Sequence, residues 1–263
     1  GSRVPSSTGP PGEMNRVEAM VQIAQHGLPY RVAVDLEFVL EGGRTHRTRI
    51  HVTESRQEVI VPLPERPLAV RLDPDLHVFR RVARHALAPM LNMYVTDTHR
   101  TVLVPPASSQ QPRPFSDIVQ RIVAQEASKP EPLRTTVKQP EDKMKGMPAG
   151  SVLVLGGPGE NPAASDILHY CGDHVRFSEK GFAVEGQPYE GATMALLVSC
   201  RRDDQPGSVV TLLYGVTPQA LTRVARLLFF YGWQSYVVFH EGAVVARGDW
   251  EDRMTTEVRI ETR

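Results

Sequence analysis

Hydrophobic and polar residues alternate in a series of short runs along the first quarter of the chain. Alternation with a period of two places successive side chains on opposite faces of an extended backbone, so each run predicts a strand with one buried face. Polar segments such as Glu41-Gly42-Gly43-Arg44 separate the runs, as expected for turns. So many short strands in succession favour a small antiparallel β-sandwich. The runs lie at Val17–Val21, Tyr30–Phe38, Ile50–Val52, Val59–Leu63 and Leu68–Leu72.

Helices and linkers are predicted next, as far as residue 150. Asp73-Pro74-Asp75 combines a capping residue, a proline suited to the first turn and a second acid. Apolar residues then recur at helical spacing as far as Met90, which predicts a helix. A strand is expected at Thr101–Val104 and a second helix at Ser116–Ala127. The proline-rich, polar segments Ala107–Pro114 and Lys129–Gly150 are interpreted as linkers.

The remainder of the chain has a different pattern, with continuous apolar runs at Ser151–Leu155, Ala195–Ser199 and Val209–Tyr214. Such runs are typical of strands that are covered on both faces. Thr217-Pro218 begins a helix with a capping hydroxyl, and Tyr236–Phe239 predicts a further buried strand that leads through a turn into another short strand. Strands and helices in this order predict a small α/β domain with a mixed sheet.

These patterns predict an α+β protein with two domains. Residues 1–14 are interpreted as a tag and flexible leader, because Gly1-Ser2 is typical of a cloning scar. The β-sandwich is assigned to 15–75, helices and linkers to 76–150, the α/β domain to 151–250 and a tail to 251–263. Within this tail Val258 and Ile260 alternate with charges, which fits a short edge strand or a frayed end.

Composition narrows the classes of function. The chain has 263 residues, with 30 Lys and Arg balancing 30 Asp and Glu, so it has no basic excess for nucleic acid or an anionic membrane. No apolar run approaches the roughly 20 residues of a spanning helix, so a soluble globular protein without a transmembrane segment is expected. The two cysteines, Cys171 and Cys200, are interpreted first as small buried hydrophobes, with a single disulfide as the alternative if the protein is exported.

The histidines do not form a recognisable metal motif. In H-E-x-x-H, two histidines one helical turn apart bind zinc and the glutamate activates water. The pair His240-Glu241 is followed by Val244 at the position of the second histidine. A site built from His169, Cys171 and His174 is disfavoured, because the segment has no further ligand at metal-binding spacing. No metal or catalytic residue is therefore assigned in this chain.

The glycine-rich segment Gly156-Gly157-Pro158-Gly159-Glu160-Asn161 is the most informative local motif. It connects a predicted strand to a predicted helix, where free backbone N–H groups and the helix dipole favour anions. The third glycine of G-x-G-x-x-G is replaced by Pro162, and the lysine of a P-loop is absent. A tight turn is the favoured interpretation, and an anion site formed by Gly156, Gly157, Gly159 and Asn161 is the alternative.

Two blocks of sequence carry a resemblance to a known family. In the first, Gln22 or Gln25 precedes Pro29-Tyr30-Arg31 and the strand Val32–Phe38, and Pro67 leads to Leu72-Asp73-Pro74-Asp75 and Phe79-Arg80. This block resembles the immunoglobulin-like domain of gluzincin zinc aminopeptidases of the membrane-alanyl-aminopeptidase type. The later block resembles a C-terminal α/β extension of some bacterial relatives. Its matching segments are Leu155-Gly156 to Asn161, Gly215 to Pro218-Gln219-Ala220-Leu221, and Tyr231 to Ser235-Tyr236.

The resemblance implies an immunoglobulin-like sandwich followed by an α/β domain, both outside the catalytic domain. Because H-E-x-x-H is absent, zinc is expected only in an upstream catalytic domain of the same polypeptide, and this chain is expected to be inactive alone. The resulting hypothesis is an accessory region that packs on that domain or regulates access to it, located by analogy in the periplasm or cell envelope. The alternatives are an α/β domain that binds a small anionic ligand, and a module that binds a peptide or protein through a sandwich edge or the 116–127 helix.

Overall fold

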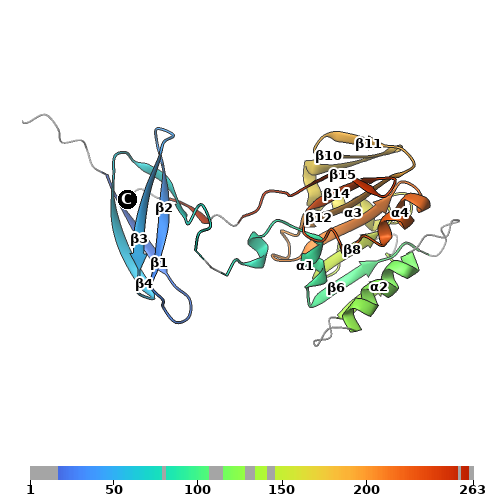
Figure 1. Cartoon of the computed structure of the whole chain (residues 1–263), viewed down its shortest axis with the longest axis horizontal. Coiled ribbons are helices and arrows are strands. Elements are labelled where there is room, and N and C mark those ends of the chain that lie inside the picture. The colour runs from blue at the N-terminus through green and yellow to red at the C-terminus, as the bar shows by residue number, and fades with distance from the viewer. Residues whose placement is uncertain are drawn as a thin grey trace, which may run out of the picture. The chain divides into compact units, whose positions relative to one another are not determined.

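The structure is a computed structural model that describes residues 17–78, 81–106, 115–127, 134–140, 146–253 and 256–260. The predicted tag and leader at 1–14, the linker Ala107–Pro114 and parts of the linker Lys129–Gly150 lie outside the described residues. The chain divides into two compact units (Figure 1). The first unit contains the residues up to Arg81 and the C-terminal strand, and the second unit is Val82–Arg253.

The first unit consists of two antiparallel sheets, one with two strands and one with four in the order β16-β5-β2-β3. Their alternating side chains bury one face each, and Ala19, Val61 and Phe38 from the two sheets share one hydrophobic core. The strands predicted before residue 73 are thus confirmed. Their bounds are β1 (Val17–Ala24), β2 (Val32–Leu40), β3 (Thr45–Val52), β4 (Arg56–Leu63), β5 (Pro67–Leu72) and β16 (Thr256–Arg259).

A row of ion pairs crosses the outer face of the four-stranded sheet. Glu257, Arg71, Glu37 and Arg47 are cross-strand neighbours in register. Arg71 bonds to Glu257 at 2.8 Å and to Glu37 at 3.0 Å, and Arg47 bonds to Glu37 at 2.6 Å. The hydrogen bond from Arg47 lowers the pKa of the Glu37 carboxyl below its ordinary value; partial burial opposes this shift and Arg71 adds to it.

The second unit is built on a seven-stranded mixed sheet in the order β15-β14-β12-β13-β8-β6-β7. The strands β13, β8, β6 and β7 run parallel, and β12, β14 and β15 are antiparallel to their neighbours. The mixed sheet and the α+β class are as predicted. The strand bounds are β6 (His99–Leu103), β7 (Arg134–Lys138), β8 (Ser151–Leu155), β12 (Met194–Arg201), β13 (Val209–Gly215), β14 (Tyr236–His240) and β15 (Ala243–Gly248).

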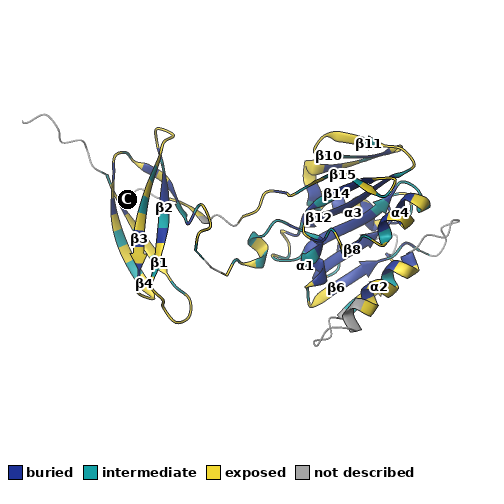
Figure 2. Cartoon of the chain, viewed as in Figure 1, coloured by how far each residue is buried: buried dark blue, intermediate teal, exposed yellow. Residues whose placement is uncertain are grey.

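Both faces of this sheet are covered, which explains the continuous apolar runs. Leu153 and Leu155 of β8 point into a core shared with three helices, and Val152 and Val154 point into a second core on the other face. Figure 2 accordingly shows β8 as wholly buried. Helices α1 (Leu91–Val95), α2 (Phe115–Ala127) and α4 (Pro218–Ala225) cover the first face. The second face is covered by α3 (Ala163–Cys171), the 3-10 turn η2 (Gly172–His174) and a sheet of β9 (Val175–Ser178), β10 (Gly181–Val184) and β11 (Gln187–Glu190).

The predicted helix that starts at Asp73 is wrong. Asp73 has a positive φ of 49°, and its carboxylate accepts hydrogen bonds from the backbone N–H groups of His77 and Val78, which closes a turn. Further along, the helical segments among the described residues before residue 96 are the 3-10 turn η1 (Arg84–Ala86) and α1. Arg84 donates there to the carbonyl of Gly207 in a distant loop and to the carbonyl of Met93 in α1, so side-chain bonds hold this segment in a non-helical course.

The predicted boundaries at 76–150, 151–250 and 251–263 also differ from the two compact units. β6 and β7 lie in the same sheet as β8, so the second unit begins near residue 82 and not at 151. Part of the linker Lys129–Gly150 is strand β7. The tail contains β16, which pairs with β5 of the first unit, so the edge-strand interpretation is confirmed. No helix among the described residues has the length and apolar character to cross a membrane.

Candidate functional site

The glycine-rich segment forms the turn between β8 and α3. Gly156 has a φ of 89°, and its N–H donates to the carbonyl of Leu213 at 3.0 Å. A Cβ on Gly157 would lie 2.3 Å from the ring of Tyr214, so that position has no room for a side chain. Gly159 has open space around it. Backbone conformation and close packing therefore account for the first two glycines.

Four N–H groups of this turn donate within the chain, those of Gly156, Gly157, Glu160 and Asn161. The Gly157 N–H donates to the Glu160 carboxylate at 3.2 Å, and the N–H groups of Glu160 and Asn161 donate to the Gly157 carbonyl. Asn161 is fully buried, and its amide donates to the carbonyls of Leu103 and Leu155 while accepting from the Ala163 N–H. This geometry favours the structural turn. The anion site at Gly156, Gly157, Gly159 and Asn161 stays a prediction. One of its donors, the Gly157 N–H, already donates to the Glu160 carboxylate.

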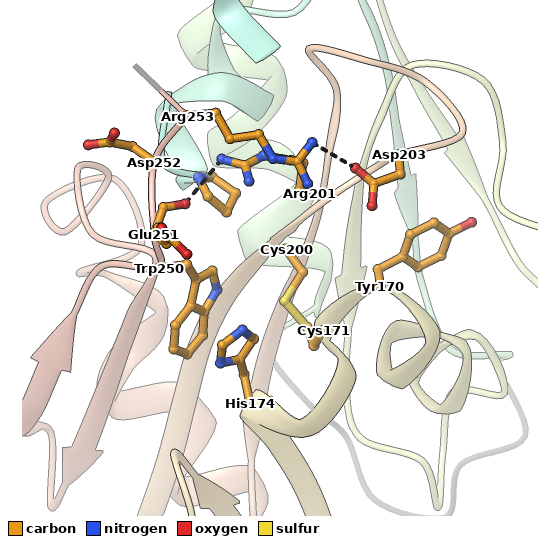
Figure 3. A pocket seen from close by; sticks show the side chains of 11 residues that line it. Tyr170, Cys171, His174, Cys200, Arg201, Asp203, Trp250, Glu251, Asp252 and Arg253 are labelled. Carbon is orange, nitrogen blue, oxygen red and sulfur yellow. Dashed lines mark hydrogen bonds and ion pairs between the residues drawn. A yellow bond between two sulfur atoms is a disulfide. The ribbon is translucent and has the colours of Figure 1, made fainter. Parts of the chain in front are cut away.

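A pocket of about 400 Å³ lies elsewhere in the second unit (Figure 3). It is formed where β12 ends, beside the C-terminus of α3, the turn η2 and the segment 250–253 that follows β15. Its volume is within the usual range for small-molecule sites. The residues that line it come from four separate parts of the chain, so no local motif marks it. Its walls combine a disulfide, aromatic rings and charged side chains.

The disulfide joins Cys171 at the end of α3 to Cys200 in β12, with Cα atoms 5.2 Å apart. The interpretation of both cysteines as unbridged buried residues is therefore wrong, and the alternative of a single bridge is correct. α3 packs on β12, which brings the two thiols together although they are 29 residues apart in sequence. Because both sulfur atoms are bonded, the site of His169, Cys171 and His174 is excluded as a thiolate metal site.

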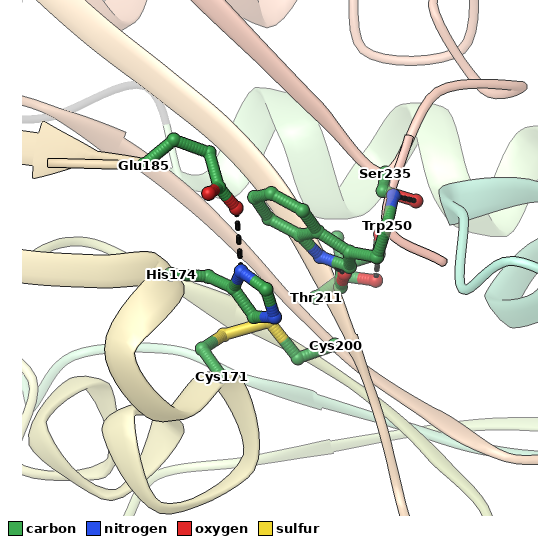
Figure 4. Close-up of a disulfide and its surroundings, with 8 residues drawn as sticks. Cys171, His174, Glu185, Cys200, Thr211, Ser235 and Trp250 are labelled. Carbon is green, nitrogen blue, oxygen red and sulfur yellow. Dashed lines mark hydrogen bonds and ion pairs between the residues drawn. A yellow bond between two sulfur atoms is a disulfide. The ribbon is translucent and has the colours of Figure 1, made fainter. Parts of the chain in front are cut away.

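An aromatic stack stands beside this disulfide (Figure 4). The Trp250 ring stacks on His174 at 4.5 Å and on Tyr236 at 4.7 Å between ring centroids. The indole N–H donates to the carbonyl of Ser199 at 2.8 Å, and the Trp250 backbone N–H donates to the Ser235 hydroxyl. His174 also bonds to Glu185 at 2.5 Å. These contacts hold the wall in one conformation.

Two arginines form the opposite wall. Nη2 of Arg201 donates to the backbone carbonyls of Leu87 and Glu251. Arg253 lies 3.4 Å from the carboxylate of Asp203. Burial lowers the pKa of the Arg201 guanidinium, and the neighbouring charge of Arg253 lowers it further. The pocket thus holds two cations close together in a partly desolvated setting.

The segment Arg201-Arg202-Asp203-Asp204 has the mixed charges of a solvated loop, but its first two residues are part of the packed structure. Arg201 ends β12 and lines the pocket. Arg202 is fully buried; it bonds to Asp204 and to the carbonyls of Pro148 and Gly150 and lies over the ring of Tyr170. The signal in the sequence was a mixed-charge segment directly after an apolar strand. It could not show which residues the two arginines contact, because those residues are distant in sequence.

The histidines add no metal centre. Among the described residues, no group of three or more His, Cys, Asp or Glu side chains is placed to hold a metal ion. His240 ends strand β14 and Glu241 begins the turn that follows, so the pair is not on a helix, as predicted.

No family model matches the chain, and no curated protein is detectably similar to it. The resemblance to zinc aminopeptidases therefore stays a prediction.

Proposed function

We propose that this chain is a non-catalytic accessory region of a metallopeptidase-like protein and docks on an upstream catalytic domain of the same polypeptide. In this proposal the first unit is an immunoglobulin-like sandwich domain, and the second unit is a separate α/β domain. The resemblance of the two sequence blocks supports both assignments. The observation that carries the proposal is an exposed apolar face on the first unit.

This face is the outer side of the two-stranded sheet. Met20 of β1 and Ile60 of β4 are direct cross-strand partners and are 65% and 59% exposed. On one side the next outward pair is polar, with Gln22 donating to Glu58 at 2.6 Å, and on the other side the charged Glu18 lies opposite Pro62. An apolar centre with a polar rim is typical of protein interaction surfaces. We therefore propose that the β1–β4 face is the surface that docks on the catalytic domain.

The disulfide supports export. Disulfides form and persist in oxidising compartments and are rare in the cytosol. Cys171 and Cys200 are therefore expected to be paired in a periplasmic or cell-envelope protein. Cell fractionation tests this part of the proposal, and a parent protein found only in the cytosol, with both thiols free, would contradict it.

Hydrogen exchange measured by mass spectrometry tests the docking. The β1–β4 peptides are expected to exchange more slowly in the full-length parent than in this chain alone, because docking covers them. Met20→Ser with Ile60→Ser should remove the added protection. Val245→Ser is the matched control, since Val245 is 52% exposed on β15 in the second unit. Equal exchange in parent and isolated chain would overturn the proposal, as would zinc-dependent aminopeptidase activity of this chain alone.

A further inference from the structure

The pocket beside the disulfide has donors on one wall that are not used by the protein. Nη2 of Arg201 donates to two backbone carbonyls. Its Nε and Nη1 have no hydrogen-bond acceptor within the part of the chain that the structure describes. Arg253 has one long ion pair, at 3.4 Å, with Asp203. The two guanidinium groups lie beside each other in Figure 3, and their mutual repulsion is one cause of the lowered Arg201 pKa. A ligand carboxylate would supply the missing acceptors and relieve the repulsion.

The same pocket carries acidic groups. Glu251 lines it, and its carboxylate makes no hydrogen bond or ion pair with any described side chain. Asp203 and Asp252 also line the pocket. With two arginines and three acids, the lining has no excess of positive charge, so a simple anion would meet repulsion as well as attraction. A ligand with an ammonium group beside its carboxylate would satisfy both kinds of charge.

The remaining walls set the size of this ligand. Tyr170, the Cys171–Cys200 bridge and Trp250 provide apolar surface between the charged groups. Trp250 is held by its two ring stacks and its indole hydrogen bond, so this wall is already in place before a ligand arrives. A volume of about 400 Å³ accommodates a molecule the size of a dipeptide.

We propose that this pocket binds a small zwitterion, with a free carboxylate against Arg201 and Arg253 and an ammonium group against Glu251. A dipeptide with free termini is the simplest ligand of this kind. The site lies wholly within the second unit and needs no partner domain. The ligand-binding proposal can therefore be tested independently of the proposal that the β1–β4 face docks on another domain.

Calorimetric titration with Ala-Ala tests the proposal, with N-acetyl-Ala-Ala, Ala-Ala-amide, alanine and inorganic phosphate as comparison ligands. Ala-Ala is expected to bind, and each blocked dipeptide should bind about tenfold more weakly or worse, because each lacks one charge. Binding by alanine but not Ala-Ala would restrict the zwitterion to a single amino acid and overturn the dipeptide assignment. Equal binding of either blocked form, tight binding of phosphate, or binding of neither Ala-Ala nor alanine up to about 10 mM would overturn the zwitterion site.

Variants and a local probe locate the binding. Arg253→Gln and Glu251→Gln alter exposed side chains, so both should fold, and each should weaken Ala-Ala binding about tenfold. Arg247→Gln and Glu190→Gln are controls with the same charge changes on exposed residues outside the pocket lining. In ¹⁵N NMR spectra, Ala-Ala should shift the indole signal of Trp250 and leave that of Trp233, which is 70% exposed and not part of the lining. A shift at Trp233 alone, or equal losses in the controls, would contradict the assignment.

Discussion

The two units are both rich in strands, but different interactions stabilise each unit internally. In the first unit each sheet buries one face, and the outer face of the four-stranded sheet carries ion pairs such as Arg47–Glu37 and Arg49–Asp35. In the second unit the central strands are buried on both faces, and a disulfide ties α3 to the sheet. Exposed ion pairs respond to pH and salt, whereas burial and covalent links respond to substitution and reduction. The two units should therefore be separable by the perturbation that loosens each one.

Removal of the disulfide should have the largest effect, and only on the second unit. The double substitution Cys171→Ser with Cys200→Ser releases a loop closed across 29 residues and is expected to lower the free energy of unfolding by about 2–4 kcal/mol. Hydrogen exchange should then accelerate in α3 and β12 and stay unchanged in β2 and β3. A reducing agent added to the unaltered protein should reproduce the result. Equal acceleration in both units would contradict the separation.

Asn161→Ala should have the next largest effect. The buried amide serves the carbonyls of Leu103 and Leu155 at the ends of β6 and β8, and alanine leaves both without that donor. A loss of about 1–3 kcal/mol is expected from chemical denaturation of the second unit. Gly159→Ala is the control in the same turn, because an added Cβ there meets nothing within 4 Å. If both variants cost the same, the turn is not held by Asn161.

Removal of β16 should loosen the first unit. A chain that ends at Arg253 loses the strand that pairs with β5, including the neighbours Val258 and Val70 and the pair Glu257–Arg71. The expected cost is on the order of 1–2 kcal/mol, seen as faster exchange in β5 and β2. A chain that ends at Ile260 keeps the strand and should behave as the full chain does. Loosening of the second unit to the same degree would show that β16 serves both.

Acid should produce the smallest effect, and in the first unit it acts through Glu37. Asp204 in the second unit also has a lowered pKa, because Arg202 donates a hydrogen bond to its carboxylate, so each unit is followed separately. The folded-state pKa of Glu37 is lowered, so its contribution is present above the ordinary carboxyl value of 4.5 and is lost as the pH falls through the lowered pKa. Glu37→Gln should flatten the dependence of first-unit stability on pH in this acidic range. Glu18→Gln, at an exposed position on β1, is the control and should leave the dependence unchanged. If Glu37→Gln leaves the pH profile unaltered, the ion pairs of Glu37 do not cause the pH dependence of first-unit stability.

Local patterns were sufficient where a segment is stabilised by its own side chains. Alternation identified β1 to β5, and the capped start of α4 is confirmed, since the Thr217 hydroxyl accepts from the Ala220 N–H. β7 was missed because Val137 is its single apolar residue and it lies at the sheet edge. β9 to β11 were also not predicted, although Glu185-Gly186, both with positive φ, marks the turn between β10 and β11. The predicted helix after Asp73 failed because contacts with distant loops replaced it.

Patterns along the chain were enough to predict the strand-rich character of both halves, the change from one-sided to two-sided burial and the turn at Gly156–Asn161. Those features depend on residues adjacent in the chain, whose side-chain period and backbone preferences act over a few positions. Tertiary packing was needed to pair Cys171 with Cys200, to place β16 in the first unit and to bring Arg201, Arg253 and Glu251 around one pocket. These residues meet because packed strands and helices bring distant segments together, and spacing along the chain does not record which distant segments will become neighbours.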